Sequence, residues 1–302
     1  MVLAVAGCSS GGSSGSGADP GAKASTTAAS STTTTSAVPK PLADQAAPTS
    51  INGIAVQGDT IWVASIKDDL ILQVDRESGA ILRRIDTKGA GPDDVAVAPD
   101  GSIWSTGFGN GDVGHITGGK YSVVTNLGAG INPIAVDAEG VVWIGSYGPN
   151  GSLYEVDPKA LPASGAPAPV AKGTMPDINA FGILDDGTIV SPAGGIAGPG
   201  SAIAIDPDTG TFTTIVGDLP GVAAGTTDSQ GRPYVLANAV GQVIAVNLDD
   251  KTSQVTQTVK KGAPFDNLSF ADDGTLYLSS FIAPTITEVQ PDGTERLITI
   301  GG

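Results

Sequence analysis

The chain has 302 residues, of which 40% are hydrophobic, and its 31 Asp and Glu residues outnumber 15 Lys and Arg to give a formal net charge of −16. An acidic surface of this kind repels nucleic-acid phosphates, so nucleic acid is excluded as a partner, and the charge suits an exported protein. No apolar run of the sequence approaches the roughly 18–20 residues that a membrane-spanning helix needs.

The sole cysteine, Cys8, lies at the end of the segment VAGC. This segment resembles the bacterial lipobox, in which small residues precede a cysteine that is lipid-modified and becomes the mature N-terminus. The resemblance implies that residues 1–8 are a lipoprotein signal segment. It also implies that Cys8 holds the protein on the extracytoplasmic side of the cell membrane. The alternative is an apolar N-terminus with a chance cysteine.

Residues 9–50 consist mainly of Ser, Thr, Gly, Ala and Pro. They offer almost nothing to bury, so burial cannot offset the entropy of ordering them. We therefore expect a disordered linker over 9–50, acting as a tether between the membrane and a folded domain that spans residues 51–302.

From Ile51 onward one unit recurs six times. Each unit opens with a short apolar strand, at 54–56, 95–97, 134–136, 181–183, 225–227 and 268–270. A turn glycine follows each strand, at Gly58, Gly101, Gly140, Gly187, Gly231 and Gly274, with separations of 39 to 47 residues. A second strand then carries a bulky residue at one fixed place: Trp62, Trp104, Trp143, Val190, Tyr234 and Tyr277. A third strand ends in Val74, Ile116, Val156, Ile205, Val246 and Val289.

Four short strands in each unit of roughly 40–45 residues are typical of propeller blades. The sequence therefore predicts an all-β fold, a six-bladed β-propeller of four-stranded blades. Large flat side chains are suited to burial between adjacent blades, so Trp62, Trp104 and Trp143 are expected there.

Two segments carry a resemblance to known families: GPDDVAVAPDGSIWSTGFGNGDVGHIT at 91–117 and INPIAVDAEGVVWIGSYGPNGSLYEVD at 131–157. They resemble the repeats of streptogramin (virginiamycin B) lyases and of NHL-type propellers. The gluconolactonase/regucalcin superfamily is similar in the same way. The shared residues belong to turns and core, so the resemblance implies a fold and leaves function to be argued from the site.

The residue just before each inner strand defines a column that faces one mouth of the central tunnel. In chain order this column reads Asn52, Asp93, Asn132, Asn179, Ala223 and Asp266. Asp94 and Asn267 stand one place further on, where the pleat of a strand is expected to turn them away.

Two carboxylates and three amide carbonyls suit a hard divalent cation, Ca²⁺ or less readily Mg²⁺. We call Asn52, Asp93, Asn132, Asn179 and Asp266 the mouth ring. The alternative is that these residues are turn formers that hydrogen-bond their own backbone.

The gluconolactonase/regucalcin resemblance implies a divalent metal held by a Glu of the first blade, two Asn of middle blades and an Asp of the fifth. Asn132 and Asn179 stand at the two asparagine positions. Asn52 replaces the Glu, and Ala223 replaces the Asp that is that family's favoured base. These departures disfavour lactone hydrolysis.

Streptogramin lyases use a tunnel histidine as general base, whereas the one histidine here, His115, lies in a third-strand column opposite the buried one. We expect His115 on the surface.

Two functions remain open. The favoured one is a non-catalytic, lipid-anchored module that binds a small-molecule or protein ligand on its rim. The alternative is a metal-dependent lactone or ester hydrolase with Asp93 or Asp266 as base.

Overall fold

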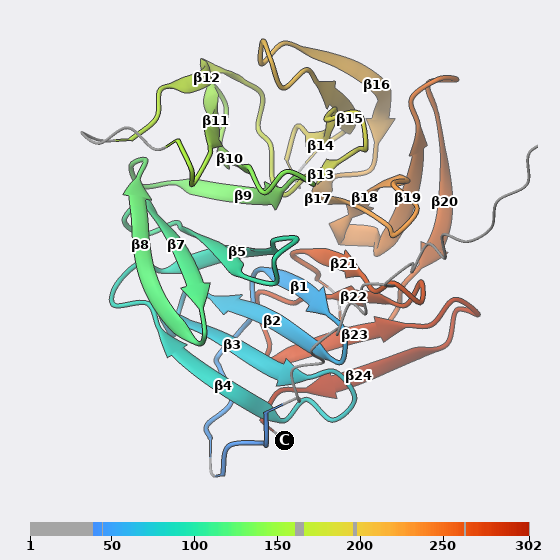
Figure 1. Ribbon diagram of the computed structural model, residues 1–302. Coiled ribbons are helices and arrows are strands. Elements are labelled where there is room, and N and C mark those ends of the chain that lie inside the picture. Colours follow the sequence, from blue (N-terminus) through green and yellow to red (C-terminus); the bar gives the residue numbers. More distant parts are fainter. Residues whose placement is uncertain (1–38, 44, 161–165, 196–197, 263, 302) are drawn as a thin grey trace, which may run out of the picture. The chain divides into compact units, whose positions relative to one another are not determined.

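The computed structural model describes residues 39–43, 45–160, 166–195, 198–262 and 264–301, so Cys8 and most of the expected tether lie outside the described residues. The described residues form 24 strands in six antiparallel four-stranded sheets, each built from four consecutive strands (Figure 1). This confirms the six-bladed all-β propeller. No helix in the described ranges is long and apolar enough to span a bilayer.

The first three blades comprise β1 (Ile54–Gln57), β2 (Thr60–Ser65), β3 (Leu70–Asp75) and β4 (Ile81–Asp86); β5 (Pro92–Val97), β6 (Ile103–Gly107), β7 (Asp112–Thr117) and β8 (Lys120–Asn126); and β9 (Ile131–Val136), β10 (Val142–Ser146), β11 (Gly151–Val156) and β12 (Pro169–Met175). In each blade the first strand lies innermost and the fourth outermost.

The last three blades comprise β13 (Gly182–Ile183), β14 (Ile189–Ala193), β15 (Gly200–Ile205) and β16 (Phe212–Leu219); β17 (Val222–Thr227), β18 (Pro233–Ala237), β19 (Gln242–Asn247) and β20 (Thr252–Thr258); and β21 (Leu268–Phe270), β22 (Leu276–Leu278), β23 (Thr285–Val289) and β24 (Glu295–Thr299). A short 3-10 helix, η1 (Asn238–Val240), connects β18 to β19.

The hydrophobic core consists of six clusters, one between each pair of adjacent blades. The second-strand column supplies a bulky residue to every cluster, because these side chains point from one blade toward the next. Trp62, Trp104 and Trp143 are 5%, 3% and 7% exposed, which confirms their expected burial between blades. The third-strand column is buried as well.

The turns between the first and second strands explain the recurring glycine. The Gly101 N–H donates to the Ala98 carbonyl at 2.8 Å, and Gly101 has a φ of 82°. Residues with a side chain rarely adopt this left-handed backbone, so glycine is favoured at each repeat of the turn. This tight turn also fixes the register between the first and second strands of the blade.

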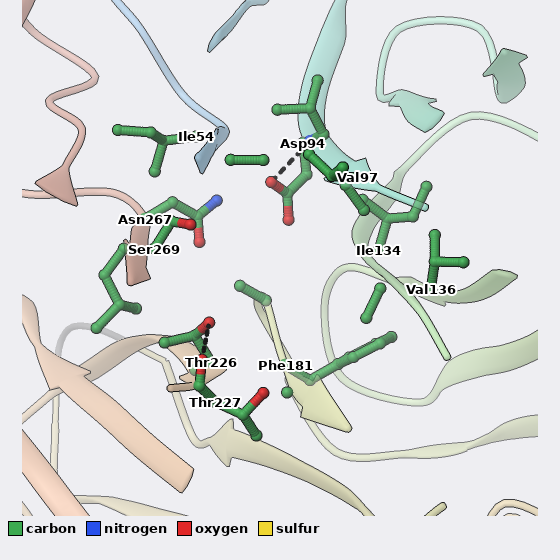
Figure 2. A pocket seen from close by; sticks show the side chains of 18 of the residues that line it. Ile54, Asp94, Val97, Ile134, Val136, Phe181, Thr226, Thr227, Asn267 and Ser269 are labelled. Atoms are coloured by element: carbon green, nitrogen blue, oxygen red, sulfur yellow. Dashed lines mark hydrogen bonds between the residues drawn. The ribbon is translucent and has the colours of Figure 1, made fainter. Parts of the chain in front are cut away.

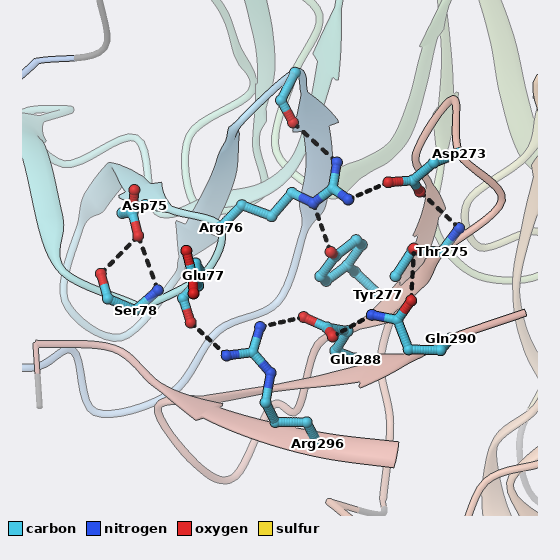
Figure 3. A network of polar contacts seen from close by, with 11 residues as sticks. Asp75, Arg76, Glu77, Ser78, Asp273, Thr275, Tyr277, Glu288, Gln290 and Arg296 are labelled. Atoms are coloured by element: carbon cyan, nitrogen blue, oxygen red, sulfur yellow. Dashed lines mark hydrogen bonds and ion pairs between the residues drawn. The ribbon is translucent and has the colours of Figure 1, made fainter. Parts of the chain in front are cut away.

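The ring closes where the first blade meets the sixth. Arg76 donates from Nε to the Tyr277 hydroxyl at 2.7 Å and forms an ion pair with Asp273 (Figure 3). Arg296 pairs with Glu288 in the same region. We call these five residues the clasp. Backbone bonds add to it, from Ile51 N–H to the Ser280 carbonyl at 3.2 Å and from Gly301 N–H to the Gly79 carbonyl at 3.0 Å.

Part of the segment before the first blade also contacts the propeller. Leu42 N–H donates to the Ile81 carbonyl at 2.7 Å. Thr49 donates to the Asp68 carboxylate from its backbone at 2.6 Å and from its hydroxyl at 2.8 Å. The described end of the linker therefore lies along the first blade before the chain enters β1.

Candidate functional site at the tunnel mouth

A β-bulge at the start of each innermost strand shapes the tunnel mouth. In the second blade Pro92 pairs with Gly107 and Asp94 with Thr106, which leaves Asp93 as an extra residue. Corresponding extra residues occur at the start of the inner strand in the other five blades. A bulge re-aims side chains and interrupts the strict alternation of a strand. The six bulges place the column that contains the mouth ring at one end of the tunnel.

The two aspartates of the mouth ring lie near each other around Asn52. The Asn52 Nδ2 donates to the Asp266 carboxylate at 2.8 Å. Asp93 is 6% exposed, and the charge of Asp266 acts on it. No Lys, Arg or His among the described residues forms an ion pair with either carboxylate. The mouth therefore holds two neighbouring carboxyl groups that no basic side chain of the described ranges balances.

Two amides of the mouth ring have buried oxygens without a hydrogen-bond donor among the described residues. These are the Oδ1 atoms of Asn132 and Asn179. A buried carbonyl oxygen that accepts nothing costs about 1–3 kcal/mol, so natural structures seldom leave one unexplained. A turn residue that bonds its own backbone would have satisfied this oxygen. Both orphan oxygens instead suit a ligand that accepts lone pairs.

Burial raises the pKa of all three aspartates near the mouth. Burial is the main cause for Asp93, and the charges of Asp266 and Asp94 add to it. Burial raises the pKa of Asp266 to about 6, against a lowering effect of the Asn52 amide. Burial raises the pKa of Asp94 to about 8, although the backbone N–H of Val95 favours its charged form. Each carboxyl would ionise more readily beside a cation.

The expectation that Asp94 and Asn267 turn away from the tunnel is wrong. Asp94 belongs to β5 and is 4% exposed, and Asn267 directly precedes β21 and is also 4% exposed. Both line the central cavity, where Figure 2 shows their side chains facing one another. The physical reason is the bulge, because an extra residue at Asp93 and at Asp266 resets the alternation on which the expectation depended.

Gly53 makes room for this arrangement in the blade between them. A Cβ built on Gly53 would stand 2.7 Å from the Asp94 Oδ1 and 2.6 Å from the Asp94 Cα. Any side chain there would collide with the second blade. At 52–53, Asn52 therefore belongs to the mouth ring, and the missing side chain of Gly53 leaves room for the carboxyl of Asp94.

Two further groups at the mouth were missed by the sequence analysis. Tyr147 and Asp177 form a small niche with Asn179 and Ala223. Asp177 accepts a hydrogen bond from the Gly148 N–H at 3.2 Å. Burial raises the pKa of Tyr147, and the charges of Asp177, Asp266 and Asp93 raise it further, which places its hydroxyl in the field of the mouth. No repeat column could reveal them, because both lie in connecting loops.

His115 lies outside the tunnel, as expected. It is in β7, opposite Trp104, and stacks on that ring with centroids 4.3 Å apart. Its imidazole is partly exposed and contacts the Thr117 hydroxyl at 3.2 Å. No histidine among the described residues is therefore placed to act as a base in the tunnel.

The mouth ring suits a hard cation because it combines carboxylate oxygens with amide oxygens. It is not a cluster of carboxylates alone. Among the described residues no group of three or more His, Cys, Asp and Glu side chains converges to hold a metal. The mouth offers two aspartates together with orphan amide oxygens. Ca²⁺ accepts such mixed carboxylate and carbonyl sets, and Mg²⁺ does so while retaining water. The metal assignment itself stays a prediction.

Comparisons with known proteins agree with this architecture. A virginiamycin B lyase from Staphylococcus aureus has a TM-score of 0.57 at 15% identity, covering 86% of this chain and 87% of the other. A gluconolactonase from Xanthomonas campestris has a TM-score of 0.62 at 14% identity, covering 78% and 84%. The calcium-binding protein regucalcin from Agrobacterium tumefaciens has a TM-score of 0.56 at 16% identity, covering 78% and 83%. Neither a family model nor a curated protein matches the chain.

The six four-stranded sheets define the protein as a six-bladed β-propeller. More particularly, its fold is similar to those of the gluconolactonase, the regucalcin and the virginiamycin B lyase named above. Identities of 14–16% establish the fold alone. The activity has to be argued from the residues of the mouth.

Proposed function

We propose that the protein is an exported, lipid-anchored propeller that binds a ligand without catalysis and holds a divalent cation at its tunnel mouth. One observation carries the proposal: Asp93 is buried and Asp266 partly buried near it, and neither pairs with a Lys, Arg or His among the residues that the structure describes. An uncompensated buried charge costs several kcal/mol. A Ca²⁺ or Mg²⁺ ion would neutralise both carboxylates and satisfy the oxygens of Asn132 and Asn179.

The similarity to regucalcin, which is described as a calcium-binding protein, supports the choice of cation. The ligand set differs from the one that the family resemblance implies, since Asn52 and Ala223 replace its two acidic residues. In this chain Asp93 and Asp266, on either side of the first blade, supply the negative charge instead. The two carboxylates that supply the charge therefore lie near the blades where the ring closes, across the mouth from the oxygens of Asn132 and Asn179.

The loops around the mouth support ligand binding on the rim. The connections between second and third strands lie at the same end of the blades as the mouth ring, because neighbouring strands are antiparallel. They expose Tyr147, Val240 and Ile282, at 46%, 48% and 57%. Phe108 packs edge-to-face on Tyr147 with centroids 6.2 Å apart. Apolar side chains around an acidic centre suit a small-molecule or protein ligand with an apolar body.

Hydrolysis of a lactone or ester is a second candidate, and Asp94 is the observation that favours it. A carboxyl with a pKa of about 8 that points into the tunnel is suited to general acid–base work near neutral pH. When bound, a metal at the mouth would polarise a carbonyl oxygen. Against this candidate stands Ala223, which provides no base at the fifth-blade position.

Calorimetric titration with Ca²⁺ and Mg²⁺ tests the proposal. Wild-type protein should bind one cation and unfold at a higher temperature in its presence, because a ligand of the folded state stabilises it. Asp93→Asn and Asp266→Asn should each weaken binding, whereas exposed Asp249→Asn should not. Equal unfolding temperatures in chelator and in Ca²⁺ would remove the metal site. Metal-dependent turnover of lactones or esters that is lost in Asp94→Asn would favour the hydrolase instead.

A further inference from the structure

A second polar site lies inside the tunnel, below the mouth ring. The Asp94 carboxyl and the Asn267 amide face each other across the central cavity (Figure 2). One Asp94 oxygen accepts from the Val95 N–H at 2.9 Å. The Asn267 side chain, in a residue that is 4% exposed, has no hydrogen-bond partner among the described residues. A buried amide that points into a cavity without a partner indicates that something else fills the cavity.

An ionised Asp94 carboxylate would have no group of opposite charge in the walls of the cavity. The cavity is lined by the six innermost strands, and none of its lining residues is Lys, Arg or His. The proposed divalent cation balances the charges of Asp93 and Asp266, so the Asp94 carboxylate still lacks a partner of opposite charge. This charge count rests on the proposed function, whereas the pairing of Asp94 with Asn267 does not.

The hydrogen-bond acceptors and the volume of the cavity indicate which kind of ligand it can hold. Besides Asp94 and Asn267, the cavity presents the hydroxyls of Thr226, Thr227 and Ser269 (Figure 2). Its volume is about 220 Å³, and a water molecule takes up about 30 Å³ in the liquid. A bare metal ion would leave most of this space empty and would find one carboxylate here, whereas Ca²⁺ takes six to eight oxygens. An ammonium group needs three acceptors and carries one charge.

We infer that the tunnel binds the primary ammonium group of a small organic amine, held between the Asp94 carboxylate and the Asn267 amide oxygen. The three N–H groups donate to Asp94, Asn267 and a neighbouring hydroxyl. The alkyl part of the amine fills the rest of the cavity between the small residues of the inner strands, such as Ala55, Ala96 and Ala135. A divalent cation at the mouth and an ammonium below it together neutralise all three aspartates.

Titration of the full chain with n-butylammonium, followed by calorimetry in chelator and again in Ca²⁺, tests this site. Two control ligands separate charge from hydrogen bonding: 1-butanol lacks the charge, and tetramethylammonium lacks the N–H donors. We expect saturable binding of butylammonium, and binding weaker by about tenfold or more for both controls. Asp94→Asn should lower the affinity by at least about tenfold. Asn267→Leu, which keeps the volume and removes the acceptor, should lower it as well, and Asp249→Asn should not.

The outcomes are distinct. The inference is overturned if butylammonium shows no saturable binding, or if Asp94→Asn binds it as tightly as wild type. It is also overturned if Asp93→Asn abolishes binding while Asp94→Asn keeps it, because the amine would then lie at the mouth. Loss of Ca²⁺ binding with butylammonium binding intact would refute the proposed cation and leave this site standing. The cooperative unfolding transition of each variant shows that it is folded.

Discussion

Replacing Asp94 by asparagine should stabilise the metal-free protein, by an amount that grows with pH. Burial raises the pKa of Asp94 from an ordinary value of 3.8 to about 8, so between these values the folded state holds a proton that the unfolded chain releases. The free energy of unfolding of the wild type therefore falls by about 1.4 kcal/mol for each pH unit in this window. At pH 7 the accumulated cost is about 4 kcal/mol. Asparagine has the same shape and does not titrate.

Urea unfolding in chelator, followed by tryptophan fluorescence from pH 5 to pH 8, measures this cost. The difference in free energy of unfolding between Asp94→Asn and wild type should rise steadily across the range and level off above pH 8. Asp249→Asn serves as control, because an exposed substitution should stay within about 0.5 kcal/mol of wild type. A difference that does not change with pH, or a variant less stable than wild type at pH 7, would refute the reasoning.

Three further predictions concern other parts of the molecule. Trp104→Ala should destabilise the propeller by about 3–5 kcal/mol in chemical denaturation, since it removes a large side chain from between the second and third blades; a loss under 1 kcal/mol would contradict its burial. Arg76→Met should cost about 1–2 kcal/mol, because its bonds to Tyr277 and Asp273 are partly exposed, and cooperative unfolding at the wild-type midpoint would show that the clasp is dispensable. Cys8→Ser should move the protein from the membrane to the soluble fraction, and continued partition with membranes would disprove the lipid anchor.

The periodic features of the fold could be predicted from the sequence. Trp62, Trp104 and Trp143 recur at one place in successive repeats. They do so because adjacent blades pack in the same way each time and require a large side chain between them. The turn glycines recur because the same left-handed backbone conformation is needed in each repeat. Such features are local and are imposed by packing, so the residue type carries the information.

The interior of the tunnel could not be predicted in the same way. A bulge at Asp93 is invisible in the hydrophobic pattern, because it changes the direction of side chains without changing their order. The roles of Asp94 and Asn267 therefore followed only from the paired register. Tyr147 lies in the loop between β10 and β11 and Asp177 in the connection from β12 to β13, so their proximity depends on how the third and fourth blades pack. Gly53 gave a signal that repeat analysis would overlook, since glycine there serves a neighbouring blade.

Closure of the ring has a consequence for how the gene can be rearranged. Each blade is a contiguous stretch of chain, so the seam between the first and last blades is held by the clasp, the packed cluster and backbone bonds, with no shared strand. The two ends of the propeller meet there, since Gly301 lies against Gln45 and Ala47. A short peptide could join them, and new termini could be opened between any two blades. A circularly permuted chain of this kind should keep the tunnel and its aspartates, because every strand would retain its neighbours.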